Sequence, residues 1–173
     1  RPQEEVDAIM QLFREYLNEA EERKEENREK GISLRFIGDR RGIPEDIQAL
    51  MEHIENESQY ETKVVLNLAV NYGGRHEITE GVKKIAEKVK NGEISPEDIT
   101  EDMISGSLYT KNLPEPDLII RPSGEYRLSN FLTWQSAYSE FWYSDILWPD
   151  FTEEHVNQIL EDYQKRNRRF GGV

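Results

Sequence analysis

Apolar side chains recur at helical spacing near the start of the chain and again near its end. The first set predicts one long amphipathic helix from residue 3 to about residue 29, with a distal part, EERKEENREK, that is polar all round and extends beyond the core. The second set predicts a last helix capped by Thr152 and carrying Val156, Ile159, Leu160 and Tyr163. Both helices are therefore expected to pack one face against a core.

Four short apolar runs between these helices predict β-strands: ISLRFIG, TKVVLNLAV, DLIIR and EFWYSDIL. TKVVLNLAV is almost continuously apolar, which is typical of a strand buried on both faces. Helical segments are predicted at residues 44–57 and 76–91, after Ser95-Pro96, after Thr100 and over LSNFLTWQ. This alternation predicts an α/β fold in which a mostly parallel central sheet carries helices on both faces, as one domain over residues 1–173.

Composition narrows the possible partners. The chain has 173 residues, 33% of them charged, and a formal net charge of −13. Nucleic-acid partners are disfavoured, because phosphate binding requires a basic surface. The chain contains no apolar run long enough to span a bilayer, no secretory leader and no cysteine, so we expect a cytoplasmic protein without disulfides.

Polar residues gather where three predicted strands end: GDRRG at 38–42, NYGGRHE at 71–77 and RPSGEYRLS at 121–129. In parallel sheets, ligands collect at the carboxyl ends of strands. A plain strand-to-helix connection is the simpler interpretation of NYGGRHE, and a turn carboxylate that of Asp39. His53, His76 and His155 are dispersed and show no metal-ligand spacing, which favours surface or capping roles.

The third of these loops carries the most informative chemistry. Arg121 and Arg127 flank a turn with Gly124, and Ser129 follows near the start of the predicted helix, where backbone amides favour an anion. The loop is thus either a cradle for a doubly charged or diphosphate ligand, or an arginine pair neutralised by acids such as Glu125, with Ser129 capping the helix. Local chemistry leaves both interpretations open.

Glu140 is the second unusual residue, because it lies among aromatic side chains, where a carboxylate requires a partner or a cation. Its spacing separates it from Ser129. One helix over residues 129–140 would place the two about 16 Å apart, and a return to a parallel strand would put Glu140 at the opposite end of the sheet. A bend or a dimer contact would be needed to bring them together.

The run DLIIRPSGEYRLSNFLTWQSAYSEFWYSDILWPDF resembles the signature region of the cis-prenyltransferases, in particular bacterial undecaprenyl diphosphate synthases. The similarity continues through RPQEEVDAIMQLF, RFIGD, LNLAVNYGGRHEI and RNRRFGG, and so covers nearly the whole chain. The resemblance implies a cytoplasmic, magnesium-dependent homodimer that adds isopentenyl diphosphate to an allylic diphosphate such as farnesyl diphosphate. The product would be a long cis-polyprenyl diphosphate, a lipid cell-wall precursor that brings peripheral membrane contact.

By the same resemblance, specific residues acquire roles. The diphosphate of isopentenyl diphosphate would be held by Arg121, Arg127 and Ser129, and magnesium by Glu140. Arg1 and Pro2 match the end of the family's Asn-Trp-x-Arg-Pro stretch, beside the substrates. The substrate-binding set is completed by the carboxyl-terminal Arg-x-Gly element, Arg169 and Gly171, which acts across the dimer in related enzymes. The long first helix would help to wall the hydrophobic tunnel that receives the growing product.

Two departures from the family pattern affect these expectations. Pro122 stands where the family usually has threonine, which stiffens the loop. The family's Asp-Gly-Asn-Gly-Arg-Trp phosphate loop, which supplies the metal-binding aspartate, has no counterpart here. We therefore expect a carboxyl-terminal part, without the amino-terminal strand and phosphate loop, that is catalytically inactive alone because the catalytic aspartate lies upstream.

Two other functions are conceivable for this sequence. A non-catalytic binding subunit of a heteromeric prenyltransferase would need no diphosphate loop, so Arg121, Arg127 and Ser129 argue against it. A generic nucleotide-binding or dinucleotide-binding domain would need a glycine-rich phosphate loop, and the sequence contains none. Prenyl transfer is therefore the favoured function.

Overall fold

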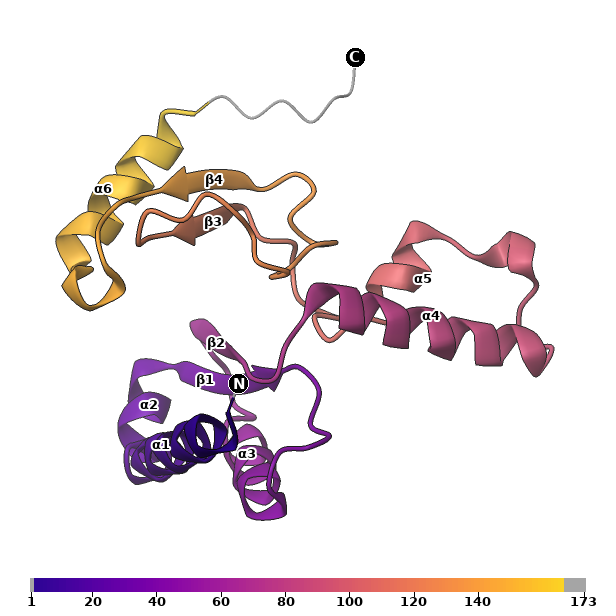
Figure 1. Ribbon diagram of the computed structural model, residues 1–173, viewed down its shortest axis with the longest axis horizontal. Helices are drawn as coiled ribbons and strands as arrows, with labels where there is room; N and C mark the ends of the chain where they lie inside the picture. Colours follow the sequence, from indigo (N-terminus) through magenta and orange to yellow (C-terminus); the bar gives the residue numbers. More distant parts are fainter. Residues whose placement is uncertain (1, 167–173) are drawn as a thin grey trace. The chain divides into compact units, whose positions relative to one another are not determined.

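The computed structural model describes residues 2–166 and divides the chain into two compact units (Figure 1). Unit 1 is Arg1–Tyr72 and unit 2 is Gly73–Val173. The elements of unit 1 are α1 (Gln3–Glu22), α2 (Lys24–Lys30), β1 (Ile32–Ile37), α3 (Glu45–Glu57) and β2 (Val64–Ala69). Those of unit 2 are α4 (Gly74–Lys90), η1 (Pro96–Asp98), α5 (Glu101–Ser105), β3 (Leu118–Arg121), β4 (Glu140–Tyr143), η2 (Trp148–Asp150) and α6 (Glu153–Gln164).

The four strands form two parallel pairs, one in each unit. β1 pairs with β2, from Ile32 opposite Val64 onward, and β3 pairs with β4, from Leu118 opposite Glu140 onward. Parallel pairing and the α/β class are confirmed. A parallel neighbour can be reached only by a long crossover; α3 lies in the crossover from β1 to β2, whereas the described segment between β3 and β4 contains no helix.

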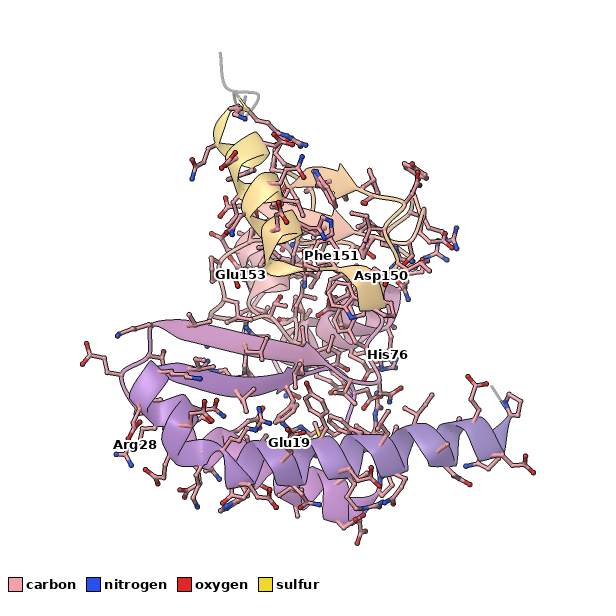
Figure 2. All side chains as sticks on the ribbon, turned by 90° about the vertical axis from the view of Figure 1, so that its left-hand side faces the viewer. Glu19, Arg28, His76, Asp150, Phe151 and Glu153 are labelled. Atoms are coloured by element: carbon pink, nitrogen blue, oxygen red, sulfur yellow. The ribbon has the colours of Figure 1, made fainter. Side chains whose placement is uncertain are left out.

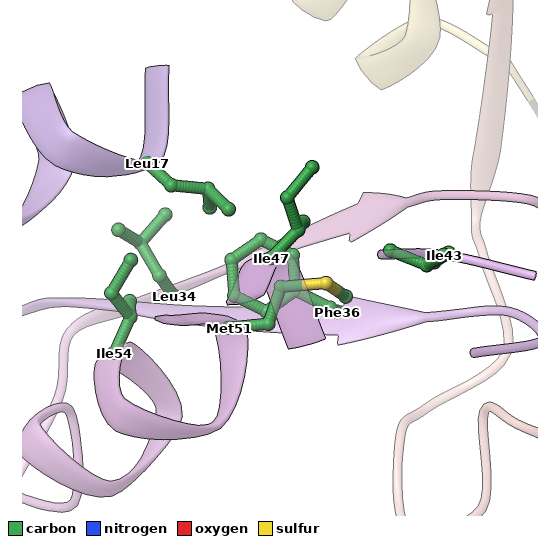
Figure 3. Packing of buried hydrophobic residues seen from close by; sticks show 7 residues of the cluster. All are labelled: Leu17, Leu34, Phe36, Ile43, Ile47, Met51 and Ile54. Carbon is green, nitrogen blue, oxygen red and sulfur yellow. The ribbon is translucent and has the colours of Figure 1, made fainter. Parts of the chain in front are cut away.

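The core of unit 1 is a single apolar cluster between the helices and the strand pair (Figure 3). β1 contributes alternate side chains, so Leu34 and Phe36 are buried while Arg35 between them is exposed. The buried members of the cluster come from α1, β1, the loop before α3, and α3: Leu17, Leu34, Phe36, Ile43, Ile47, Met51 and Ile54. Their periodicity explains why the sequence predicted these elements correctly.

The long first helix is interrupted. α1 ends at Glu22 and α2 begins at Lys24, so the continuous helix expected to about residue 29 is broken at Arg23. α2 buries none of its residues and ends at Gly31, whose φ of 70° is left-handed. Arg28 of α2, labelled in Figure 2, lies 5.8 Å from the ring centre of Tyr60. Without an apolar stripe, the polar segment depends on such surface contacts.

β2 differs from its prediction, because the expected buried strand is largely exposed. Val64, Val65 and Leu66 are 55%, 37% and 46% exposed. β1 occupies one edge of β2, and no other described strand pairs with it. An apolar run therefore predicted the strand correctly, but burial on both faces requires covering layers that unit 1 does not supply.

The outer edge of β1, in contrast, is covered by side chains. The Phe36 amide donates a 2.9 Å hydrogen bond to Glu55 of α3, and the Tyr60 hydroxyl donates to the carbonyl of Ile32. Both backbone groups point away from β2. The residues of β1 that alternate with Ile32 and Phe36 are those whose backbone groups bond to β2. β1 is thus enclosed on both edges.

Unit 2 confirms several predicted helix starts. Thr100 caps α5 by accepting a 3.3 Å hydrogen bond from the Met103 amide. At the start of α6, His155 Nδ1 accepts the Thr152 amide at 3.1 Å, which confirms a capping role for this histidine. Phe151, labelled in Figure 2 just before α6, stacks on Trp148 with ring centres 5.6 Å apart.

The helix expected over LSNFLTWQ is wrong. Residues 128–135 form turns and bends instead. The cause lies in the backbone, because Ser129, Asn130 and Leu132 have φ values of 50°, 66° and 46°. A right-handed helix cannot pass through left-handed residues. Among the described helices, none is both long and apolar enough to cross a bilayer.

Candidate functional site

Arg121 is the last residue of β3, and the loop that follows it is tied to the segment after β4. The Ser123 amide donates to the carbonyl of Ile146 and the Gly124 amide to that of Ser144, both at 2.8 Å. Ser123 and Gly124 have left-handed φ values of 71° and 67°. These two amides are therefore engaged within unit 2 and are not available to a ligand.

Arg121 and Ser129 face each other, with 3.4 Å between the arginine Nη2 and the serine Oγ. The Nε atom of Arg121 is buried and has no hydrogen-bond partner. No carboxylate in the described part of the chain forms an ion pair with this guanidinium. Burying an unpaired charged donor is costly, so the arrangement favours an anionic partner.

Arg127 is placed differently, because its guanidinium pairs with Glu125 at the surface. Its side chain is 64% exposed and that of Glu125 is 35% exposed. The salt-bridge interpretation is confirmed for Arg127, and the anion cradle stays a prediction for Arg121. Arg127 is neutralised locally, whereas Arg121 is not. Ser129 caps no helix, since none of the described helices begins there.

Both arginines line a pocket of about 380 Å³ whose remaining wall is mostly apolar. Ser129 does not line it but contacts Arg121, which does. The apolar lining comes from β3, the loop and η2: Ile119, Ile120, Leu128, Phe131 and Trp148. Cationic forks beside an apolar wall suit a small amphiphilic anion, with its charged group at the arginines and its hydrocarbon on the wall.

Glu140 lies away from these arginines. It begins β4 opposite Leu118, whereas Arg121 lies opposite Tyr143 at the other end of the pair. This register separates Glu140 from Arg121 by about 10 Å along the strands. Its Oε2 accepts a 2.9 Å hydrogen bond from Arg166 Nη1, which also donates to the carbonyl of Phe141 at 3.0 Å. Glu140 thus has a cationic partner.

The described residues of unit 2 do not form a magnesium site on their own. Magnesium is commonly held by one or two carboxylates together with substrate phosphates. Glu140 has one oxygen engaged by Arg166, and its backbone lies three residues along the strand pair from the level of Arg121. No group of three or more potential ligands occurs among residues 2–166. The role of Glu140 as a metal ligand stays a prediction.

The start of α4 is joined to the arginine loop, residues 121–129 with the adjoining Asn130, by a residue that the sequence did not single out. The carbonyl oxygen of Asn130 accepts the Gly74 amide at 2.7 Å, and its side-chain Oδ1 accepts the Arg75 amide at 2.8 Å. A Cβ atom on Gly73 would lie 2.9 Å from the Asn130 side chain. The Gly-Gly pair was a usable signal, since such pairs allow close backbone approach.

A buried carboxylate on the same helix anchors the far end of this segment. Glu77, 1% exposed, accepts the Gln135 amide through Oε1 at 3.0 Å and the Tyr109 backbone amide through Oε2 at 3.0 Å. Gln135 also donates to Thr110 at 2.8 Å. The sequence offered one signal, because Glu77 occupies the helical stripe that continues through Gly81 and Ile85.

The other sequence candidates have local partners. Asp39 accepts bonds from the backbone and the side chain of Arg41, as expected of a turn carboxylate. His53 lies 3.3 Å from Glu21. Arg1, Arg169 and Gly171 lie outside the described residues, so their substrate-binding roles stay predictions.

The parallel strand pairs and their helices define a protein of the α/β class, with two arginines on a pocket of unit 2. The chain belongs to the undecaprenyl diphosphate synthase family of prenyltransferases, whose family model matches residues 1–171. The resemblance inferred from the motifs is thereby confirmed.

Curated relatives agree with this membership. The chain is 50% identical to an isoprenyl transferase of Clostridium perfringens and 45% identical to one of Bacillus anthracis, over 100% of its length. It spans about two thirds of these relatives, 67% and 66% of their respective lengths. The chain is accordingly a prenyltransferase of isoprenoid biosynthesis.

Solved structures share the fold. Lavandulyl diphosphate synthase from Lavandula x intermedia, crystallised with dimethylallyl diphosphate, is 38% identical with a TM-score of 0.92 over 99% of this chain and 73% of that one. A probable undecaprenyl diphosphate synthase from Campylobacter jejuni is 30% identical with a TM-score of 0.83, covering 99% of this chain and 77% of that one.

Proposed function

We propose that this chain belongs to an enzyme that condenses isopentenyl diphosphate with an allylic diphosphate, such as farnesyl diphosphate, to give a long cis-polyprenyl diphosphate. The observation that carries the proposal is the unneutralised Arg121 beside Ser129, on a pocket with an apolar wall. Arg121, Arg127 and Ser129 would hold the diphosphate of isopentenyl diphosphate, and Ile119, Leu128 and Phe131 would contact its five-carbon chain.

In this reaction the isopentenyl double bond attacks C1 of the allylic substrate. A carbon–carbon bond forms, the C1–oxygen bond breaks, diphosphate leaves with the bonding electrons, and a proton is lost from C2 of the isopentenyl unit. The arginine loop positions the nucleophile, whose own diphosphate stays attached. Fixing both reactants lowers the entropic barrier to their meeting, and fixed cations favour the charged transition state.

An exposed apolar stripe on α1 supports a role in receiving product. Ile9, Leu12 and Tyr16 are 38%, 63% and 62% exposed, on the side of the helix that the core cluster does not use. Such a stripe suits contact with a hydrocarbon chain. We propose that it forms part of the wall of a product tunnel.

Several further assignments belong to the same proposal and rest on the family resemblance. These are a single domain over residues 1–173, a homodimer, a cytoplasmic location with peripheral membrane contact, and magnesium as the metal. Substrate contacts by Arg1, Arg169 and Gly171 complete the set. Replacing Glu140 by Gln in the complete gene product should raise the magnesium concentration needed for half-maximal rate; an unchanged requirement would remove Glu140 from the metal site.

The main test is Arg127→Ala in the complete gene product. Losing a charge-assisted contact worth about 1.5–3 kcal/mol should raise the KM for isopentenyl diphosphate about 10-fold to 100-fold. The KM for farnesyl diphosphate and the melting temperature should change little, because the side chain is largely exposed. Steady-state rates with labelled isopentenyl diphosphate measure both constants, and an unchanged isopentenyl KM would contradict the site.

Glu125→Gln is a matched variant, for which we expect no increase in the KM for isopentenyl diphosphate. Removing the acid that pairs with Arg127 frees the guanidinium, so the isopentenyl KM should stay the same or fall. Lys88→Ala removes an exposed cation elsewhere in unit 2 and should leave both constants unchanged. If the complete product binds isopentenyl diphosphate without turning over, the chain belongs to a binding subunit.

A further inference from the structure

We propose that Asn130 is a positioning residue of the diphosphate site, because it latches the arginine loop to the start of α4 and so fixes Ser129 opposite Arg121. This inference rests on the proposed function, since it concerns the same loop. Asn130 itself need not touch the substrate. It would act through Ser129, its neighbour in the chain.

The backbone around Ser129 adopts a conformation that needs outside support. Ser129, Asn130 and Leu132 all have left-handed φ values, and none of them is glycine. Residues of this kind persist in the left-handed region only where surrounding contacts impose it. Asparagine tolerates the region better than most residues. The orientation of the Ser129 hydroxyl therefore depends on whatever holds this segment.

Asn130 makes the contacts that can impose this backbone. Its carbonyl oxygen accepts the Gly74 amide and its Oδ1 accepts the Arg75 amide. These donors lie in the first turn of α4, where backbone amides have no partner within the helix. One residue thus satisfies two otherwise unpaired amides and is held by a rigid helix in return.

The two glycines before and at the helix start make this approach possible. A Cβ on Gly73 would lie 2.9 Å from Asn130 Nδ2, and one on Gly74 would lie 2.5 Å from Thr133 Oγ1. Neither glycine needs a left-handed φ, so the requirement is for space. Together with Gln135 bound to Glu77, the helix holds the segment at both ends.

The experiment measures Asn130→Ala and Asn130→Gly in the complete gene product. Alanine removes the side-chain acceptor and disfavours the left-handed backbone, whereas glycine removes only the acceptor. We expect Asn130→Ala to raise the KM for isopentenyl diphosphate at least 10-fold. Asn130→Gly should also raise this KM, but by a factor several times smaller. The farnesyl KM should stay within twofold in both variants. If the KM values for isopentenyl diphosphate and farnesyl diphosphate rise equally, or if neither rises, the positioning role of Asn130 is contradicted.

Asn112→Ala is a matched control, because Asn112 also has a left-handed φ, 69°, in the same unit but outside the arginine pocket. It should impose a similar backbone penalty and lower the melting temperature without moving the isopentenyl KM. If it raises that KM as much as Asn130→Ala does, the effect reflects general destabilisation and the inference fails.

A double-mutant cycle separates this inference from the proposed function. Ser129→Gly removes the hydroxyl while keeping the left-handed backbone accessible. If Asn130 acts through Ser129, Asn130→Ala should add less than twofold to the isopentenyl KM of Ser129→Gly. If Ser129→Gly has no effect alone, the diphosphate site itself is wrong. If the fold-increase in this KM for the double variant equals the product of the two single-variant increases, the diphosphate site is supported and the positioning role of Asn130 is contradicted.

Discussion

Units 1 and 2 are stabilised in different ways. Unit 1 buries seven apolar side chains in one cluster. Unit 2 buries fewer apolar side chains, among them Leu108, Ile119 and Ile159, and also a carboxylate and two polar side chains, Gln135 and Ser136. Among the described residues, most left-handed residues other than glycine lie in unit 2, and Asn71 is the one in unit 1; the left-handed positions of unit 1 are otherwise glycines.

The difference between the two units concerns how precisely each kind of interaction fixes the orientation of side chains. Apolar packing is insensitive to direction and gives stability broadly, whereas hydrogen bonds between a helix start and a loop fix orientation. The pocket with both arginines belongs to unit 2, the unit in which hydrogen bonds between a helix start and a loop are prominent. Orientation is what a diphosphate site requires, because its donors must point at defined oxygens.

Truncating the unit 1 core should have the largest effect. Ile47 is 0% exposed at the centre of the cluster, so Ile47→Ala should lower the free energy of unfolding by about 4 kcal/mol. Ile159→Ala in unit 2, where the residue is 1% exposed, should cost nearer 2 kcal/mol. Urea unfolding followed by circular dichroism measures both. Equal costs would show that unit 2 has a core of comparable strength.

Removing the buried carboxylate of unit 2 should come next. Glu77→Leu leaves the Tyr109 amide and the Gln135 side chain without this acceptor, which should cost about 2 kcal/mol. Glu87→Leu, at a position of the same helix whose side chain is 65% exposed, should cost under about 0.5 kcal/mol. Thermal unfolding compares them. A neutral Glu77→Leu would mean that apolar packing alone supports unit 2.

Helix capping gives a smaller effect of the same directional kind. Thr100→Ala removes the acceptor for the Met103 amide at the start of α5 and should cost about 1 kcal/mol. Thr100→Ser keeps the hydroxyl and should behave like the wild type. Urea midpoints distinguish these outcomes; a serine variant as unstable as the alanine variant would point to lost methyl packing instead.

The smallest effect is a pH dependence present in both units. The Arg14 guanidinium lowers the pKa of Asp46 in unit 1, and the Ser95 backbone amide lowers the pKa of Asp98 in unit 2. Because folding depresses both values, the stability from each carboxylate is full above its ordinary pKa of 3.8 and is lost as pH falls through the folded value.

Asp46→Asn and Asp98→Asn should therefore each flatten the fall in melting temperature below about pH 4. Added salt should weaken the Asp46 contribution more, because its partner is a surface charge, whereas Asp98 is held by a backbone amide. Identical salt dependence of the two variants would contradict this assignment.

The sequence predicted the regular elements well because their causes are local. Periodic apolar residues mark α1, α3 and α6, and Thr100 and Thr152 mark helix starts. The turn conformation of residues 128–135 could not be predicted, since Asn130 within it is bonded to the start of α4, more than fifty residues away in the sequence.

The site itself could be predicted in part. Arg121 and Ser129 lie together as their motif suggested, and the parallel register confirms that Glu140 lies at the opposite end of the strand pair. The pairing of Glu140 with Arg166 was not foreseen, because the two meet only through the packing of α6. Sequence patterns identify the residue types that can bind an anion; which charges remain unpaired is decided by the tertiary structure.

The outer edge of β1 in unit 1 is blocked to further strand pairing. Glu55 and Tyr60 occupy backbone groups that another strand would need on that side, while the far edge of β2 has no such cover from any described strand. Another strand is therefore excluded beside β1. The same carboxylate that completes the α3–β1 contact thus leaves the Phe36 amide unavailable to a further strand.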